Sequence, residues 1–282
     1  MSDTPVRIGV IIAPLGAGGD PLVLKYLLLH QNSLQQSFEF QLLPFFRHSI
    51  IQQLSAGQSP NRKEIVAAMP AFLEEYRENL AQFALGYGHP TESNLPIVIL
   101  STAKFTDNYY LTGGNGWGIV ALGNWRRIMA PPSIVEFFLS LVMELAINFA
   151  CGAAYPRRHI TTRGCCFDFT AELGDARFSV LSGFLCEQCL KTIRTAHSKQ
   201  VAEDAQVLLR KEWLGTVAEP SSVSVTAKKL GYDLFHTKGV TPTWWERTRA
   251  ILEEEVVRTI LKIIAAVVVV GLLIYFGFKS TG

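Results

Sequence analysis

The cysteines of this chain lie close together in the sequence. All five occur between Cys151 and Cys189, and the last two, Cys186 and Cys189, form a C-E-Q-C pair. A C-x-x-C pair closes a short loop that can place two thiolates about 2.3 Å from one metal ion. This clustering and spacing therefore point first to metal chemistry.

Two further ligands precede the C-x-x-C pair. The adjacent Cys165 and Cys166 each offer a sulfur, and His159 offers an imidazole. We take Cys165 as the third sulfur ligand, although the sequence does not distinguish it from Cys166. The segment 159–189 is thus predicted to form a closed tetrahedral zinc site with one ion per chain, its ligands being His159, Cys165, Cys186 and Cys189. A site closed by four protein ligands is structural, and its metal contributes to folding.

Two other interpretations of the same residues remain open. The cysteines can be small buried side chains next to a surface histidine. The C-E-Q-C pair can also be a redox pair, although it does not follow a strand in a thioredoxin-like pattern. Disulfides are disfavoured in the cytoplasm, which is where the charge pattern described below places this segment.

The rest of the composition excludes several classes of function. The chain has 282 residues, of which 49% are hydrophobic and 18% charged, and a net charge of +2. This composition excludes a disordered chain, and the balanced charge gives no electrostatic reason for nucleic-acid binding. No H-x-x-x-H pair and no G-x-S-x-G motif occurs, so we predict no catalytic residues.

Alternating strands and helices must position the predicted zinc ligands. Apolar, β-branched runs predict strands at 6–12, 38–43, 96–101 and 117–123, and periodic patterns predict helices at 21–30, 61–85 and 133–151. This alternation indicates an α/β or α+β fold with one mixed sheet. The helix 133–151 has a capping box, Ser133 with Glu136, and is apolar on nearly all sides, so it should be central. Pro70 is expected to break or kink the helix 61–85.

The C-terminal region has the composition of a membrane anchor. No charged residue occurs between Ile263 and Phe278, which predicts a transmembrane helix at 260–279. A connector at 215–242 and an amphipathic juxtamembrane helix at 243–259 should precede it. Lys and Arg are more frequent before the span than after it, so we expect a single-pass C-terminal anchor with the N-terminal domain in the cytoplasm. The transmembrane helix could also support an oligomer.

The order of several segments resembles a known family. VRIGVII, VILSTAKFTDNYY, GNGWGIVALGNWRRI, VMELAINFACG and the final C-x-x-C follow one another as in the archaemetzincins, which are metzincin zinc metalloprotease-like proteins. The resemblance covers residues 6–190. It implies a metzincin-like mixed sheet with a long central helix in residues 1–214, and a zinc site that ends in C-x-x-C. It also implies that residues 106–110 lie near the rim of an active-site cleft.

The central helix departs from the family at its catalytic motif. Aligning it with H-E-x-x-H-x-x-G-x-x-H places Met143, Ile147 and Ala153 at the three histidines, and only Glu144 is kept. A catalytic zinc needs about three protein ligands, and without it Glu144 has no metal-bound water to deprotonate. The resemblance therefore implies a catalytically inactive pseudo-metalloprotease.

The expected function follows from these features. We expect a tail-anchored, zinc-containing binding or sensing module on the cytoplasmic face of a membrane, with a protein or peptide as a possible ligand. Two alternatives remain, which are an active zinc metallopeptidase with atypical ligands and a membrane-perturbing defence effector. Glu144 on its apolar helix needs a cationic partner, for which Arg126 or Arg127 is the expected candidate.

Overall fold

A computed structural model of the protein describes residues 4–16, 21–87, 95–154, 156–160, 162–170, 172–215, 219, 222–231, 267–268 and 271. The chain divides into two compact units, Met1–Thr241 and Pro242–Gly282. In the second unit the described residues are Val267, Val268 and Gly271, which are helical and exposed. The predicted helices at 243–259 and 260–279 otherwise lie outside the described residues.

The first unit is built on a five-stranded mixed sheet. Its strands are β1 (Val6–Ile12), β2 (Phe38–Leu42), β3 (Ile97–Ser101), β4 (Leu111–Gly114) and β5 (Trp117–Ala121). They lie in the order β2-β1-β3-β5-β4, and only β4 runs antiparallel to its neighbour. The mixed sheet and four of its strands confirm the prediction. The strand β4 was not predicted, because its short L-T-G-G sequence has the composition of a turn.

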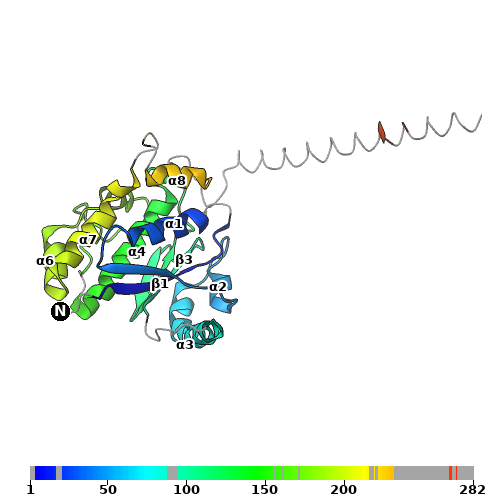
Figure 1. Ribbon diagram of the computed structural model, residues 1–282, viewed down its shortest axis with the longest axis horizontal. Coiled ribbons are helices and arrows are strands. Elements are labelled where there is room, and N and C mark those ends of the chain that lie inside the picture. Colours follow the sequence, from blue (N-terminus) through cyan, green and yellow to red (C-terminus); the bar gives the residue numbers. More distant parts are fainter. Residues whose placement is uncertain are drawn as a thin grey trace, which may run out of the picture. The chain divides into compact units, whose positions relative to one another are not determined.

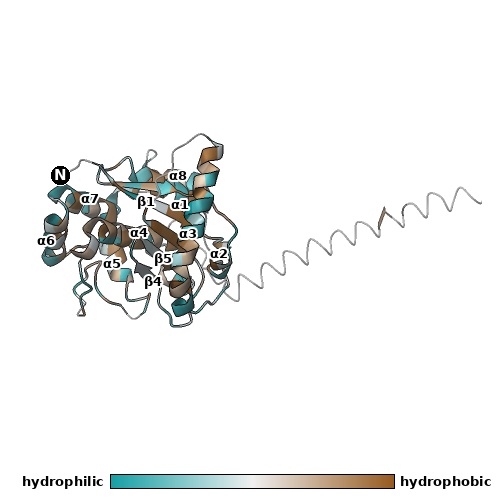
Figure 2. Ribbon diagram, turned by 90° about the horizontal axis from the view of Figure 1, so that it is seen from below, coloured by the Kyte–Doolittle hydropathy of each residue, from teal (hydrophilic) through white to brown (hydrophobic). Residues whose placement is uncertain are grey.

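Both faces of this sheet are buried, which explains the continuous apolar runs in its strands. Along β3, Val98 and Leu100 belong to one core, whereas Ile97 and Ile99 belong to the other. Successive side chains of a strand point to opposite faces, so a strand covered on both sides needs apolar residues at every position. This arrangement explains why hydrophobic residues, which are brown in Figure 2, predominate in the central strands.

Helices cover each face of the sheet (Figure 1). One core includes residues of α1 (Pro21–Gln31) and α4 (Ile134–Cys151), and the other includes residues of α2 (Ser49–Gln53) and α3 (Arg62–Gly86). Of the predicted break or kink at Pro70, the break is wrong, because α3 continues through this residue. The buried Met69 and Phe72 on either side of Pro70 hold that helix against the sheet, which compensates for the missing N–H of proline.

The helix α4 is the central helix of the unit, as predicted. Ser133 and Glu136 form the expected capping box, and nearly all side chains from Ile134 to Ile147 are buried. The segment Ile134–Ala154 is long and apolar enough to cross a membrane, and it is the one such helix among the described residues. Because most of it is buried inside the unit, it is the core helix of this fold.

In the described part of the first unit, four shorter α-helices follow α4. They are α5 (Arg177–Ser182), α6 (Glu187–Ala196), α7 (Lys199–Arg210) and α8 (Val223–Lys229). The first three pack against α4. The residues of α8 fall within the segment predicted as a connector, and its Val223 and Ala227 are buried in the same core as α4. The cysteine-rich segment therefore adjoins a substantial core.

Candidate metal centre and the adjoining cleft

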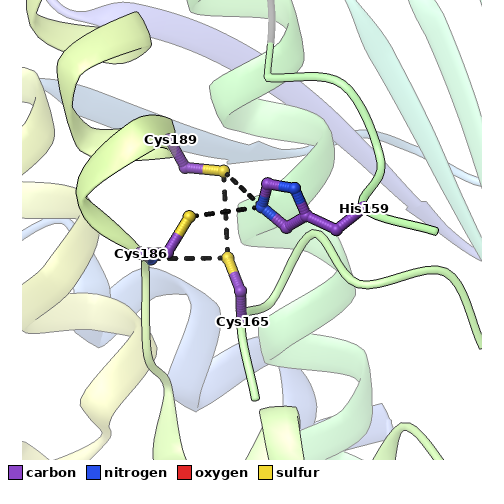
Figure 3. A group of neighbouring side chains, drawn as sticks. All are labelled: His159, Cys165, Cys186 and Cys189. Atoms are coloured by element: carbon purple, nitrogen blue, oxygen red, sulfur yellow. Dashed lines mark hydrogen bonds between the residues drawn. The ribbon is translucent and has the colours of Figure 1, made fainter. Parts of the chain in front are cut away.

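The four predicted ligands lie together between α4 and α6. One potential ligand atom from each of them lies within 4.8 Å of every other, the residues being His159, Cys165, Cys186 and Cys189. Their side chains converge on one point (Figure 3). The Nε2 atom of His159 is 3.2 Å from the Sγ atoms of both Cys186 and Cys189. The cluster could therefore hold a metal ion.

The spacing of the sulfur atoms fits a metal ion and not a disulfide. The Sγ atoms of Cys165 and Cys189 are 3.8 Å apart. Two sulfurs that each lie about 2.3 Å from a tetrahedral ion are about 3.8 Å apart, whereas a disulfide requires about 2.05 Å. Three sulfurs and one imidazole are also a donor set that suits a tetrahedral ion.

The start of α6 explains the position of two ligands. Cys186 is the N-cap residue of α6 and Cys189 lies in its first turn. Residues three apart at the start of a helix lie on the same side, so both sulfurs face the cluster. The N-terminus of a helix also carries partial positive charge, which favours thiolates.

A turn and a buried carboxylate position the other two ligands. Gly164 has a φ of +76°, a conformation that favours glycine, and it turns the chain into Cys165. The Oδ2 atom of Asp168 accepts hydrogen bonds from the backbone N–H groups of Arg163 (2.6 Å) and Cys165 (3.0 Å). The loop that carries Cys165 and Asp168 also holds His159, because the backbone N–H of His159 donates to the carbonyl of Phe167 at 2.9 Å.

The acidities of the thiols distinguish Cys165 from the adjacent Cys166. Hydrogen bonding with the Cys189 thiol lowers the pKa of Cys165, and the same interaction raises the pKa of Cys189. Burial instead raises the pKa of Cys151 to about 11 and that of Cys166 to about 12. A lowered pKa favours the thiolate form of Cys165, which is the form that binds metal. The structure thus decides between the adjacent cysteines, since the Cys166 sulfur points to the Ser179 carbonyl.

A large cleft adjoins the metal centre. Its volume is about 1080 Å³, and it is lined by β4 with its turn, by the last part of α4 and by the segment that precedes His159. The close approach of α4 to the sheet at this point depends on Gly118 of β5, where an added Cβ would lie 2.5 Å from the Leu145 side chain. The resemblance implied a cleft, but most residues of its walls were not predicted, because they come from segments that are distant in the sequence.

Glu144 lies in the wall of the cleft and has a different partner from the one expected. Its side chain is almost completely buried, and Oε1 accepts a hydrogen bond from the guanidinium of Arg158. The expected pairing with Arg126 or Arg127 is therefore wrong. Arg158 lies 14 positions after Glu144 in the sequence, and the fold of the cysteine-rich segment brings the arginine back to α4.

The other positions of the aligned catalytic motif cannot supply metal ligands around Glu144. Met143 and Ile147 are completely buried in the core, and Ala153 lines the cleft with a methyl group only. The segment 106–110, expected at the rim, does not line the cleft. Within it Asp107 pairs with Arg62 of α3 at 2.7 Å.

The acidity of Glu144 predicts a specific pH dependence. Burial raises the pKa of Glu144 from 4.5 to about 7, against the opposing attraction of Arg158. The folded protein therefore holds the Glu144 proton more tightly than the unfolded chain does. This proton contributes its full stabilisation below the unfolded-state pKa, and the stabilisation is lost as the pH rises through about 7. Between about pH 5 and about pH 8, the free energy of unfolding should fall by about 2 kcal/mol more in the wild type than in Glu144→Gln. Chemical denaturation at each pH measures this difference.

A matched control for this measurement lies on α7. Glu203 is an exposed carboxylate paired with Lys199, so Glu203→Gln should leave the pH profile of the wild type unchanged. Parallel profiles for the wild type and Glu144→Gln would show that the buried carboxyl does not titrate in this range.

Comparison of the chain with known protein families, with curated proteins and with solved structures gives no match.

Proposed function

We propose that this protein is a membrane-anchored binding module, built as a catalytically inactive metzincin-like domain and braced by a structural zinc ion. Its cleft binds an extended peptide segment on the cytoplasmic face of the membrane and does not cut it. The observation that carries the proposal is the ion pair between the buried Glu144 and the partly exposed Arg158. This pair lies in the wall of a large cleft, beside the edge strand β4, which no other described strand pairs on its outer side.

The donor set supports zinc as the ion. Zinc favours tetrahedral sites of thiolate and imidazole ligands, and a site with four protein ligands leaves no position for a substrate. The four residues of the cluster provide such a set. The proposed role of the ion is accordingly to hold together the loops that carry His159, Cys165 and the start of α6.

The environment of Glu144 supports the loss of hydrolytic activity. A general base in a zinc peptidase must accept a proton from metal-bound water. Here the carboxylate accepts a hydrogen bond from Arg158, and the neighbouring Met143 and Ile147 side chains are buried apolar groups. Beside this glutamate, the guanidinium group of Arg158 thus takes the place that a metal ion would have in an active peptidase.

The edge strand β4 supports an extended peptide as the ligand. No strand among the described residues pairs with its outer side. The N–H of Ala121 donates to the carbonyl of Tyr110 at 2.8 Å, and hydrogen-bonded pairs alternate along antiparallel strands. The backbone groups of Leu111 and Gly113 therefore face away from β5, where an added strand can pair with them. Leu111 and Gly113 also line the cleft.

The proposal is tested with an arrayed library of extended peptides of about ten residues, probed with the full chain in detergent and excess zinc. We expect binding to a subset of the peptides, and mass spectrometry should show that the bound peptides stay intact. Leu111→Pro should lose at least about tenfold in affinity, because proline removes an outward N–H while an edge position tolerates it.

Two variants give the controls. Leu111→Val keeps the N–H and should bind the same peptides as the wild type. Cleavage of peptides by the wild type that Glu144→Gln abolishes would favour the active metallopeptidase instead. An effector that perturbs membranes would lose its effect when residues 260–279 are replaced by a soluble tail, whereas peptide binding should survive that replacement.

A further inference from the structure

The metal centre and the cleft share one segment of chain. Arg157 lines the cleft, and Arg158 pairs there with the buried Glu144. The next residue, His159, supplies a ligand of the metal cluster. Because no residue separates the ion pair from the ligand, a shift of one must displace the other.

A second segment of the cluster also forms part of the cleft. Phe167 lines the cleft and accepts the hydrogen bond from the His159 N–H. The guanidinium of Arg158 donates to the carbonyl of Asp168 at 3.4 Å, and the carboxylate of Asp168 holds the N–H of Cys165. Arg158 thus contacts α4 on one side and the loop of a cysteine ligand on the other.

We propose that Arg158 is a positioning residue that couples the two sites, so that metal binding and occupation of the cleft favour each other. A bound ion fixes His159 and with it the cleft wall, which reduces the conformational freedom that a cleft ligand must otherwise remove. Coupling of this kind is reciprocal, so an intact cleft wall must also strengthen metal binding. The inference rests on the proposed function, which supplies the zinc ion and the cleft ligand.

The first measurement is the zinc affinity of the full chain, obtained by competition with a chromophoric chelator. Arg158→Leu should raise the Kd for zinc by about tenfold, the lower end of the range for residues that orient metal ligands. Arg158→Lys, which keeps a positive charge, should recover part of this loss. Should Arg158→Leu fail to fold, Glu144→Gln weakens the same contact without changing the shape of the side chain.

The matched control is another ion-paired, partly buried arginine. Arg62 on α3 pairs with Asp107, and its side chain is 22% exposed, compared with 33% for Arg158. Arg62→Leu should leave the Kd for zinc unchanged. A general loss of stability would affect both variants, whereas coupling through Arg158 affects only one of them.

The second measurement is amide hydrogen exchange in the cleft walls at 111–117 and 144–149, with and without zinc. Removal of zinc should accelerate exchange there in the wild type and should have a smaller effect in Arg158→Leu. Absence of zinc from the wild-type chain would overturn both the proposed zinc site and this inference. Zinc bound with equal Kd by the wild type and Arg158→Leu, or exchange that zinc does not change, would overturn the coupling alone.

Discussion

Replacement of Cys189 by serine is expected to abolish stoichiometric zinc binding and to cause the largest loss of stability of any single substitution in this protein. Cys189 is buried at the start of α6. Its Sγ atom lies 3.2 Å from the Nε2 atom of His159 and 3.8 Å from the Sγ atom of Cys165. Structural zinc supplies about 10–16 kcal/mol of apparent binding free energy in small domains. Because this unit also has a large apolar core, we expect a loss of about 5 kcal/mol and not complete unfolding. Elemental analysis and thermal unfolding of the full chain measure the two effects.

The neighbouring cysteine supplies the control for that substitution. Cys166 is partly buried and its sulfur points to the Ser179 carbonyl, outside the cluster. Cys166→Ser should keep one zinc per chain and change the free energy of unfolding by about 1 kcal/mol at most. A chelator should lower the unfolding temperature of Cys166→Ser as it does in the wild type, and it should not affect Cys189→Ser. Equal zinc content in the two variants would contradict the assignment of the ligands.

Replacement of Lys211 by methionine is expected to cost about 3 kcal/mol of unfolding free energy. Lys211 is only 6% exposed, and burial lowers the pKa of its ammonium group. The Nζ atom donates to Ser140 Oγ (3.0 Å), the Val180 carbonyl (2.6 Å) and the Leu209 carbonyl (2.7 Å). Both carbonyls lie in the last turn of a helix, where they lack partners within the helix and attract positive charge.

Replacing Lys211 by methionine tests the ammonium group alone, because methionine has a similar length. The φ of +59° at position 211 is equally unfavourable for lysine and methionine. Loss of the three hydrogen bonds releases α5 and α7 from α4, which also carries the cleft. Lys199→Met is the control, since Lys199 is 78% exposed and pairs only with Glu203 across one turn of α7. Urea denaturation should show a change below about 0.5 kcal/mol for Lys199→Met. Equal effects of the two substitutions would show that the buried ammonium adds nothing to stability.

Features that depend on local spacing could be predicted from the sequence. The donor set of the candidate metal centre was predicted from the C-x-x-C pair and from two residues that precede this pair, His159 and Cys165. Ligand type and short spacing limit which ion can bind, so this prediction needed no tertiary structure. The apolar runs predicted β1, β3 and β5, since strands covered on both faces are mostly apolar. The strand β2 was also predicted, although Glu39 and Gln41 alternate with its buried Phe38 and Phe40. Ser133 and Glu136 placed the start of α4 because a capping box is formed within one turn.

The tertiary structure alone decided which distant groups meet. Both candidate partners of Glu144 drawn from the sequence were wrong, and the structure supplied Arg158. The selection of Cys165 over Cys166 depends on the turn at Gly164 and on hydrogen bonds from the loop to Asp168. The cleft, its edge strand β4 and the site of Lys211 each require segments from different parts of the chain. Such contacts arise from the packing of whole elements, and side-chain type and local periodicity carry no information about which elements will pack together.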